Sequence, residues 1–253
     1  MALLWYILML ILSTVVHEFS HFKTAKHFGV TAKSFNMGMG TILYTKRTKD
    51  TDFNIRVLPF GGSCEFDDGQ LNSIKPFKRI LVLAAGPISN LILAILFYQF
   101  ATLAFCLERN FYDAVILIKV FFVSVLDFGV AGLQMIQSFF QTITQLFRLD
   151  FPTMVESGEI LNEVVASKQS IWGIAYELLS LSSMLNLLLA VVNILPIPAL
   201  DGGHITMTIP ELFGKPINPK IYNIISYSFY ILFLVLTGAF LAKDLIVTIL
   251  HLS

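Results

Sequence analysis

Long apolar segments alternate with shorter polar connections along this chain. A helix that crosses a bilayer needs about 20 mostly apolar residues. Four segments meet this requirement, at about 2–28, 80–107, 171–200 and 221–250. A fifth apolar stretch, 114–147, also contains Lys119, Asp127 and four glutamines, which is typical of an amphipathic helix on the membrane surface. We therefore predict an all-α polytopic membrane protein with about four transmembrane helices and an interfacial helix before the third.

The connection after the first apolar segment has a different period. Between residues 40 and 60, apolar and polar side chains alternate on both sides of a polar turn at 46–52. Alternation with a period of two is typical of strands, and two such runs around a short turn indicate a hairpin. The pattern predicts a membrane-associated β-hairpin within residues 36–66.

Composition agrees with a membrane protein and excludes several other classes. The 253 residues are 56% hydrophobic and 13% charged, whereas a soluble domain is about 25% charged. Seventeen basic residues balance seventeen acidic ones, so no net charge attracts nucleic acid. Cys64 and Cys106 are too few for a disulfide framework. The lipid bilayer is therefore the first partner that the sequence predicts.

The positions of the basic residues predict an orientation. Ten of the 17 Lys and Arg residues fall within residues 23–79, from the end of the first apolar segment to the start of the second, and cytoplasmic loops are rich in such residues. This connection is therefore predicted to be cytoplasmic. Both ends of the chain then lie outside, and the first segment, which lacks a cleavage site, is a retained span.

The first apolar segment contains the sequence His17-Glu18-Phe19-Ser20-His21. Residues four apart share one helix face, so both imidazoles can bind a single ion. Neutral imidazole suits zinc, and an adjacent carboxylate can accept a proton from water at the metal. Two histidines satisfied only by packing are a weaker interpretation, because ionisable groups in hydrocarbon are costly. We predict one Zn²⁺ per chain, held by His17 and His21, with Glu18 as the catalytic base.

A catalytic zinc site usually has three protein ligands and an open position. Asp201 is the candidate for the third ligand. It follows a helix break at Pro196 and Pro198 and precedes Gly202, and irregular backbone at membrane depth is tolerated where it lines a cavity. Pro196, Pro198 and Gly202 are therefore assigned structural roles beside the site.

Two alternatives remain open at this point. In the first, a glutamate such as Glu65 or Glu177 is the third ligand, and the chain is a membrane zincin of another kind. In the second, the chain is a catalytically silent scaffold or transporter that retains these residues for packing. Comparing variants of Asp201, Glu65 and Glu177 distinguishes the first, and metal analysis the second.

Together these motifs resemble the site-2 proteases, a family of intramembrane zinc metalloproteases. Residues 17–21 match H-E-x-x-H, residues 193–202 match N-x-x-P-x-P-x-L-D-G, and residues 86–90 match G-P-x-x-N. The resemblance implies that His17, His21 and Asp201 bind zinc and that Glu18 is the base. It also implies that Asn193 contacts the extended substrate or the developing oxyanion, although an amide bonded to neighbouring backbone fits Asn193 nearly as well.

The region around Gly38-Met-Gly40 and Pro59–Gly62 resembles the membrane-reentrant β-loop of the bacterial sigma-E protease branch. An edge of this hairpin near Gly38–Tyr44 could bind the substrate as an added strand. Members of that branch usually contain PDZ domains of about 80–100 residues. Here about 60 residues separate the second and third spans, so residues 1–253 are predicted to form one domain without a PDZ domain.

The resemblance further implies a bacterial inner-membrane location and single-span membrane proteins as substrates. The active site would lie toward the cytoplasmic side, because His17 is about 24 Å along the first helix. Asn90 is predicted to form an interhelical hydrogen bond, and His204 to support the site from beside Asp201. The sequence does not determine the oligomeric state.

Overall fold

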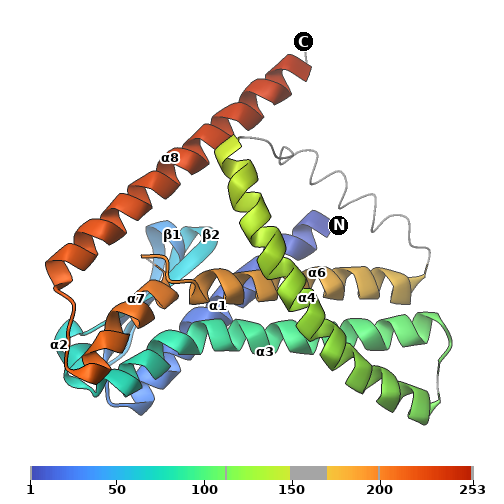
Figure 1. Cartoon of the computed structure of the whole chain (residues 1–253), viewed down its shortest axis with the longest axis horizontal. Helices are drawn as coiled ribbons and strands as arrows, with labels where there is room; N and C mark the ends of the chain where they lie inside the picture. The colour runs from blue at the N-terminus through green and yellow to red at the C-terminus, as the bar shows by residue number, and fades with distance from the viewer. Residues whose placement is uncertain (1, 112, 149–169, 199, 252–253) are drawn as a thin grey trace. The chain divides into compact units, whose positions relative to one another are not determined.

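The computed structural model describes residues 2–111, 113–148, 170–198 and 200–251 (Figure 1). Most of these residues are helical, and the predicted helix-rich fold is confirmed. The elements in chain order are α1 (Ala2–His27), β1 (Ala32–Arg47), β2 (Asp52–Phe66), α2 (Asp68–Ser73), α3 (Pro76–Glu108), α4 (Ala114–Arg148), α6 (Ile171–Ile194), α7 (Asp201–Thr208), the 3-10 helix η1 (Ile209–Phe213) and α8 (Pro219–His251).

Among the described residues, four helices contain a stretch that is long and apolar enough to cross a membrane. These stretches are Leu4–His27, Pro76–Glu108, Ile116–Gln134 and Ile171–Ile194. Three coincide with predicted spans. Ile116–Gln134 falls where the sequence predicts an interfacial helix, because Lys119 and Asp127 interrupt an otherwise apolar run. Length and composition thus also allow a crossing there, and the interfacial position stays a prediction. The predicted last span corresponds to α8, many of whose side chains lie outside the described part of the chain.

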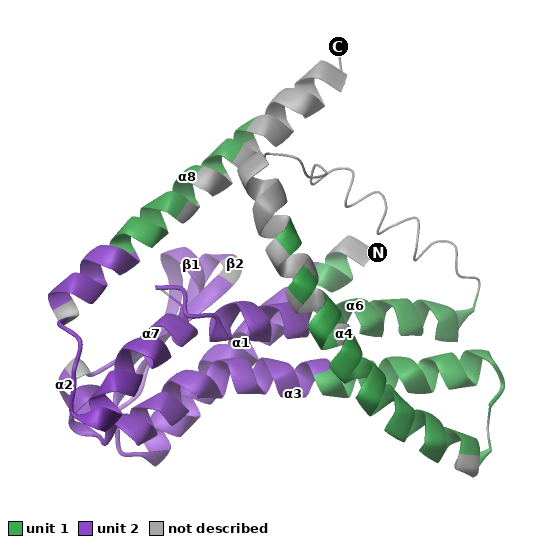
Figure 2. Ribbon diagram, in the orientation of Figure 1, with its two compact units in different colours: residues 1–6, 95–184, 227–253 green, residues 7–94, 185–226 purple. Residues whose placement is uncertain are grey.

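The chain forms two compact units (Figure 2). One comprises residues 1–6, 95–184 and 227–253, and the other comprises residues 7–94 and 185–226. The first unit contains all of α4 with parts of α1, α3, α6 and α8. The second contains most of α1, the hairpin, the beginning of α3, the end of α6, and α7. Every residue of the predicted active site lies in the second unit, which we call the site unit.

Within the first unit, aromatic rings and paired polar groups join α3, α4 and α6. The ring of Tyr98 lies 5.5 Å from that of Phe128, and the Phe105 ring lies 5.7 Å from that of Tyr176. The Ser124 hydroxyl donates a hydrogen bond to Gln99 Oε1 at 2.9 Å. This pairing satisfies polar atoms that would be costly to leave unbonded in an apolar environment.

Helix α1 runs without a break through the histidine motif. Its 26 residues span about 39 Å at 1.5 Å per residue, which exceeds the bilayer's hydrocarbon thickness. The hydroxyls of Ser13, Thr14 and Ser20 each donate to the backbone carbonyl four residues earlier. Such bonds satisfy hydroxyls inside a helix, so α1 carries polar residues without losing its helical backbone.

The predicted hairpin is confirmed, and its first strand begins at Ala32, before the alternating pattern does. Residues 34–37 of β1 have partners in two parts of β2, at 62–65 and at 52–55, so the long strands bend back on themselves. Gly38 and Gly40 adopt φ angles of 89° and 84°, which favour glycine. A Cβ on Gly38 would lie 2.3 Å from the Leu58 carbonyl oxygen. The first glycine is therefore required by the bend.

Asn36 is a buried polar centre within the hairpin and is only 1% exposed. Its amide nitrogen donates to Ser63 Oγ at 3.1 Å, and its Oδ1 accepts from Asn54 at 2.9 Å and from Arg56 Nη2 at 3.0 Å. Arg56 also donates to the Gly40 carbonyl oxygen at 2.9 Å. A fully bonded polar group of this kind fixes one register of the strands.

Aromatic side chains attach the hairpin to α1 inside the site unit. The Phe22 ring lies 5.9 Å from the Phe35 ring and 5.7 Å from the Phe53 ring. Phe22 and Phe35 are buried together with Ala32. Because Phe22 directly follows the histidine motif, this cluster places the hairpin beside His17–His21.

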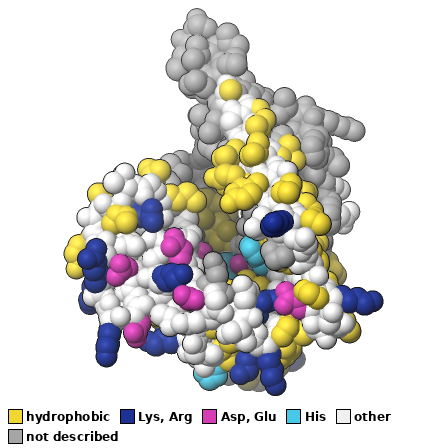
Figure 3. Space-filling model, turned by 90° about the vertical axis from the view of Figure 1, so that its left-hand side faces the viewer, with side chains coloured by type: hydrophobic (Ala, Val, Ile, Leu, Met, Phe, Trp, Pro, Cys, Tyr) yellow, Lys and Arg dark blue, Asp and Glu magenta, His cyan; other side chains and the backbone are white. Residues whose placement is uncertain are grey.

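On the face drawn in Figure 3, basic and acidic side chains are interspersed.

Candidate metal centre

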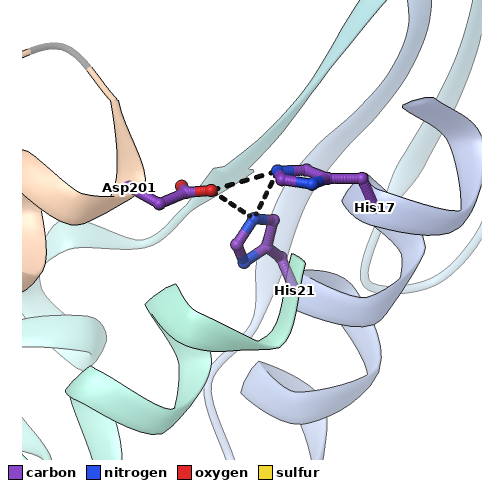
Figure 4. A group of neighbouring side chains, drawn as sticks. All are labelled: His17, His21 and Asp201. Atoms are coloured by element: carbon purple, nitrogen blue, oxygen red, sulfur yellow. Dashed lines mark hydrogen bonds and ion pairs between the residues drawn. The ribbon is translucent and has the colours of Figure 1, made fainter. Parts of the chain in front are cut away.

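Helices α1 and α7 bring three ionisable side chains together (Figure 4). The Nε2 atoms of His17 and His21, one turn apart on α1, lie 3.2 Å from each other. Asp201 is the first residue of α7, and its Oδ2 lies 3.0 Å from His17 Nε2 and 3.3 Å from His21 Nε2. Both histidines are buried. Among the described residues, these three form the group with metal-ligand geometry.

Helix α3 contacts both imidazole rings at their Nδ1 atoms and so orients them. His21 Nδ1 lies 2.7 Å from the Val82 carbonyl oxygen, to which it can only donate. The proton is therefore on Nδ1, and Nε2 keeps a free lone pair. The Asn90 amide nitrogen lies 3.1 Å from His17 Nδ1, so this contact joins α3 to α1. With the amide turned over so that Oδ1 faces the ring, His17 Nδ1–H would donate to Oδ1 and leave Nε2 for a metal.

Gly86 of α3 lies directly against the rings of His17 and His21. A Cβ at this position would lie 2.3 Å from His21 Nε2 and 2.6 Å from His17 Nε2. Any side chain there would enter the space between the presumed ligand atoms. The G-P-x-x-N element thus supplies two contacts, a close approach at Gly86 and a polar contact at Asn90.

The geometry of the three side chains fits a zinc ion. Tetrahedral zinc with bonds of about 2.0–2.1 Å separates its ligand atoms by about 3.3–3.4 Å, and the three separations here are 3.0–3.3 Å. Two imidazoles and one carboxylate are also a common catalytic set that leaves a position open. A cavity of about 530 Å³ adjoins this position and is lined by Glu18, His21, Asp201 and part of the hairpin.

The second strand of the hairpin holds Glu18 at the cavity. A Cβ on Gly62 would lie 3.0 Å from Glu18 Cγ, so the strand passes very close to the glutamate. The Cys64 backbone N–H faces the Glu18 carboxylate. This contact leaves Glu18 beside the ligand group, where it can exchange a proton with a bound water.

The local sequence around Asp201 explains how an aspartate reaches the two histidines. Helix α6 ends at Ile194 rather than near residue 200, because Pro196 and Pro198 cannot continue it. Gly202 then packs against this irregular stretch, since its Cβ would lie 2.2 Å from the Ile194 carbonyl oxygen. The new helix α7 therefore begins at Asp201 with its first turn pressed against the end of α6.

Of the remaining predicted residues, some line the cavity and others do not. His204 lines it, and its ring lies 5.3 Å from that of Tyr222. The Asn193 amide donates to the Leu189 carbonyl oxygen at 2.9 Å, which is the backbone-bonded arrangement named above as the alternative. Gly38 and Gly40 are not among the residues that line the cavity, where residues 62–66 of β2 are found instead.

The two alternative ligands also differ in position. Glu65 lines the cavity, and Glu177 belongs to the other unit. Neither is part of the group formed by the two histidines and Asp201. The side-chain geometry therefore favours Asp201 over both glutamates as the third ligand.

Sequence reasoning did not identify three contacts of the site. It named Gly86 only as part of a motif, although a glycine in an apolar helix often marks a close approach. Nothing in the sequence pointed to the Val82 carbonyl group, because every residue has a backbone carbonyl. It did not single out residues 62–66 as lining the cavity, because the bend that turns them toward Glu18 depends on long-range pairing.

Cys64 is expected to be an unreactive thiol in the metal-free protein. Burial, together with the Glu18 and Glu65 carboxylates, raises its pKa to about 12. An ordinary cysteine has a pKa of about 8.5, and only the thiolate is nucleophilic.

In a Cys106→Ser background, alkylation at pH 8 should be at least about a hundredfold slower in the folded than in the unfolded chain. The folded-state rate should keep rising above pH 9, where that of the unfolded chain levels off. Equal rates would contradict the assigned environment of Cys64.

A family model matches most of this chain, and known proteins resemble parts of it. Residues 5–236 match the family described as "Peptidase family M50". A Clostridium perfringens protein named "Putative zinc metalloprotease" is 39% identical over 92 residues, 33% of this chain and 28% of that protein. Protease RseP of Yersinia pestis is 30% identical over 115 residues, 39% of this chain and 26% of that protein. The matched part thus spans little more than a quarter of either relative. Because the family match covers most of its residues, the chain belongs to peptidase family M50, the site-2 protease family.

Proposed function

We propose that this chain is a zinc-dependent intramembrane protease that hydrolyses peptide bonds within or near the transmembrane segment of single-span membrane proteins. One observation carries the proposal. Two members of the three-ligand group, His21 and Asp201, line one cavity together with Glu18. Both histidines and the glutamate belong to a helix that is long and apolar enough to cross a membrane. The family and the names of the relatives support the same chemistry.

The proposed roles follow from the side-chain positions. His17, His21 and Asp201 would hold the zinc, which when bound supplies Lewis acidity that lowers the pKa of water toward about 7. Glu18 accepts the proton of the attacking water and delivers it to the leaving amine. Val82 and Asn90 keep the two imidazoles in the orientation that leaves Nε2 free.

The substrate must present an extended backbone, because a helix conceals its carbonyl groups in internal hydrogen bonds. Residues 62–65 pair with 34–37 on one side, and the same strand lines the cavity beside Glu18. We propose that an unwound substrate segment lies along residues 62–66 as an added strand. Gly38 and Gly40 support this strand by bending β1, and Asn193 remains a proposed contact to the substrate.

The proposed location is a bacterial cell membrane, as the organisms of the relatives suggest. The basic residues between the first and second spans favour a cytoplasmic position for the hairpin. Both ends of the chain are then proposed to lie outside.

Cleavage of a model substrate tests this function. Purified chain in lipid vesicles would be mixed with single-span proteins of different hydrophobic segments, and the products identified by mass spectrometry. Hydrolysis within or beside the hydrophobic segment, lost with a chelator and restored by zinc, is the expected result. Stoichiometric zinc without cleavage of any substrate, or a chain without zinc, would instead favour a catalytically silent scaffold or transporter.

Replacing Asp201 with asparagine is expected to weaken zinc binding more than about a hundredfold. The asparagine has nearly the same volume but no negative charge, and outer contacts of metal sites already contribute about 10–100-fold. Chelator competition followed by metal analysis measures the change. Glu65→Gln and Glu177→Gln are the matched controls and should retain zinc. Full retention by Asp201→Asn with loss in either control would assign the third ligand to that glutamate.

A further inference from the structure

Arg79 lies in the first turn of α3 and is 8% exposed. Its guanidinium reaches three separate elements of the site unit. Nη2 forms an ion pair with Glu211 in η1, Nη1 donates to Asn72 Oδ1 in α2 at 3.0 Å, and Nε donates to Thr208 Oγ1 in α7 at 3.4 Å. The sequence indicated this residue only as one of several positive charges near the membrane.

A buried charge requires a specific set of partners. Removing an arginine from water is costly, and attraction to one carboxylate seldom compensates without further hydrogen bonds. The planar guanidinium presents donors in fixed directions, which lysine cannot reproduce. Here these donors reach an acidic, an amide and a hydroxyl side chain on different segments, so the arrangement fixes their relative positions.

Two of these partners lie at the far end of the helix that begins with Asp201. Helix α7 has eight residues, or about 12 Å, and Thr208 is its last. Thr208 is 3% exposed, and its hydroxyl donates to the His204 carbonyl oxygen at 2.9 Å. Because Arg79 contacts the same hydroxyl, it is linked through Thr208 to the backbone of α7. Glu211 follows directly in η1.

Apart from the contacts of Asp201 with the two histidines, the beginning of α7 is held by close packing. Its N-terminal flanking residue, Leu200, forms no side-chain hydrogen bond to the helix. Gly202 and Gly203 press against the carbonyl oxygens of residues 194–197. This contact limits how closely the helix approaches α6, whereas rotation and sliding along α6 depend on how its other end is held.

We propose that Arg79 is a positioning residue for the metal centre. By fixing Thr208 and Glu211 against α3, it sets the position from which Asp201 meets His17 and His21. Helix α3 carries both Arg79 and the groups that orient the imidazoles, Val82, Gly86 and Asn90. One helix therefore aligns all three ligands. This inference rests on the proposed zinc-dependent function.

Zinc affinity and the spectrum of the cobalt-substituted chain test the proposal. Arg79→Ala, Arg79→Lys and Glu211→Gln would be compared with Lys75→Ala, which removes an exposed positive charge next to the same helix. We expect zinc affinity to fall about 10–100-fold in Arg79→Ala, as for other outer contacts of metal sites, and less in Arg79→Lys. The visible absorption bands of bound Co²⁺ should shift in both, because those bands report ligand geometry. Lys75→Ala should match the wild type.

Circular dichroism and thermal unfolding separate this effect from a general loss of stability. If Arg79→Ala does not fold, the milder Arg79→Lys and Glu211→Gln variants still decide the question. Unchanged zinc affinity and unchanged cobalt spectra in the folded variants, whatever their melting temperatures, would overturn the positioning role alone. A wild-type chain that binds neither metal would overturn the proposed metal centre, and this inference with it.

Discussion

Replacing Glu18 with glutamine is expected to abolish peptide-bond hydrolysis while zinc binding is unchanged. Glutamine has the same shape and can still face the Cys64 N–H, but it cannot accept the proton of the attacking water. Loss of a general base typically lowers the rate about 10²–10⁴-fold. Glu18 is not one of the three presumed ligands, so metal content should not depend on its charge.

The measurement combines cleavage of a single-span substrate with metal analysis of the same purified protein. Glu177→Gln is the matched control, because it also loses a carboxylate but Glu177 belongs to the other unit and does not line the cavity. This control should retain most of the activity. Wild-type activity in Glu18→Gln would end the proposed mechanism. A parallel loss of zinc would instead assign Glu18 a role in metal binding.

Replacing Gly86 with alanine is expected to eliminate zinc binding and, with it, activity. The added methyl group would lie 2.3 Å from His21 Nε2 and 2.6 Å from His17 Nε2, so at least one ring must move out of position. Alanine stabilises a helix relative to glycine by about 1 kcal/mol, so α3 should still form. The defect should therefore be local to the metal centre.

Zinc content and circular dichroism of Gly86→Ala test this expectation. Gly129→Ala in α4 is a suitable control, because no atom lies within 4 Å of the Cβ that it would add. The control should bind zinc as the wild type does. Stoichiometric zinc in Gly86→Ala would show that the rings have room to move and that the close approach is unnecessary.

The two local motifs of the site could be predicted because their geometry depends on nearby residues. The spacing of His17 and His21 places both rings on one face of any helix, whatever surrounds it. Likewise, Pro196 and Pro198 must end α6 wherever that helix packs. Alternation in the connection predicted a hairpin for the same reason, since side-chain direction in a strand follows from the backbone.

Contacts between distant segments could not be predicted in this way. The sequence left Asp201, Glu65 and Glu177 open as third ligands, and the packing of α7 in the site unit brought Asp201 to 3.0 Å from His17. It placed the substrate strand near Gly38 and Gly40, whereas bending of the hairpin turned residues 62–66 to the cavity.

The sequence by itself thus determined the chemistry available to this protein: two imidazoles one turn apart, a neighbouring carboxylate, and an aspartate at a helix break in an apolar chain. Only the tertiary structure decided how these groups are aligned, through Gly86, Val82 and Asn90 on α3 and through Arg79 at the start of the same helix. The physical reason is that residue types and short spacings fix local geometry. Alignment to a few tenths of an ångström depends instead on close packing and on hydrogen bonds between segments far apart in the chain.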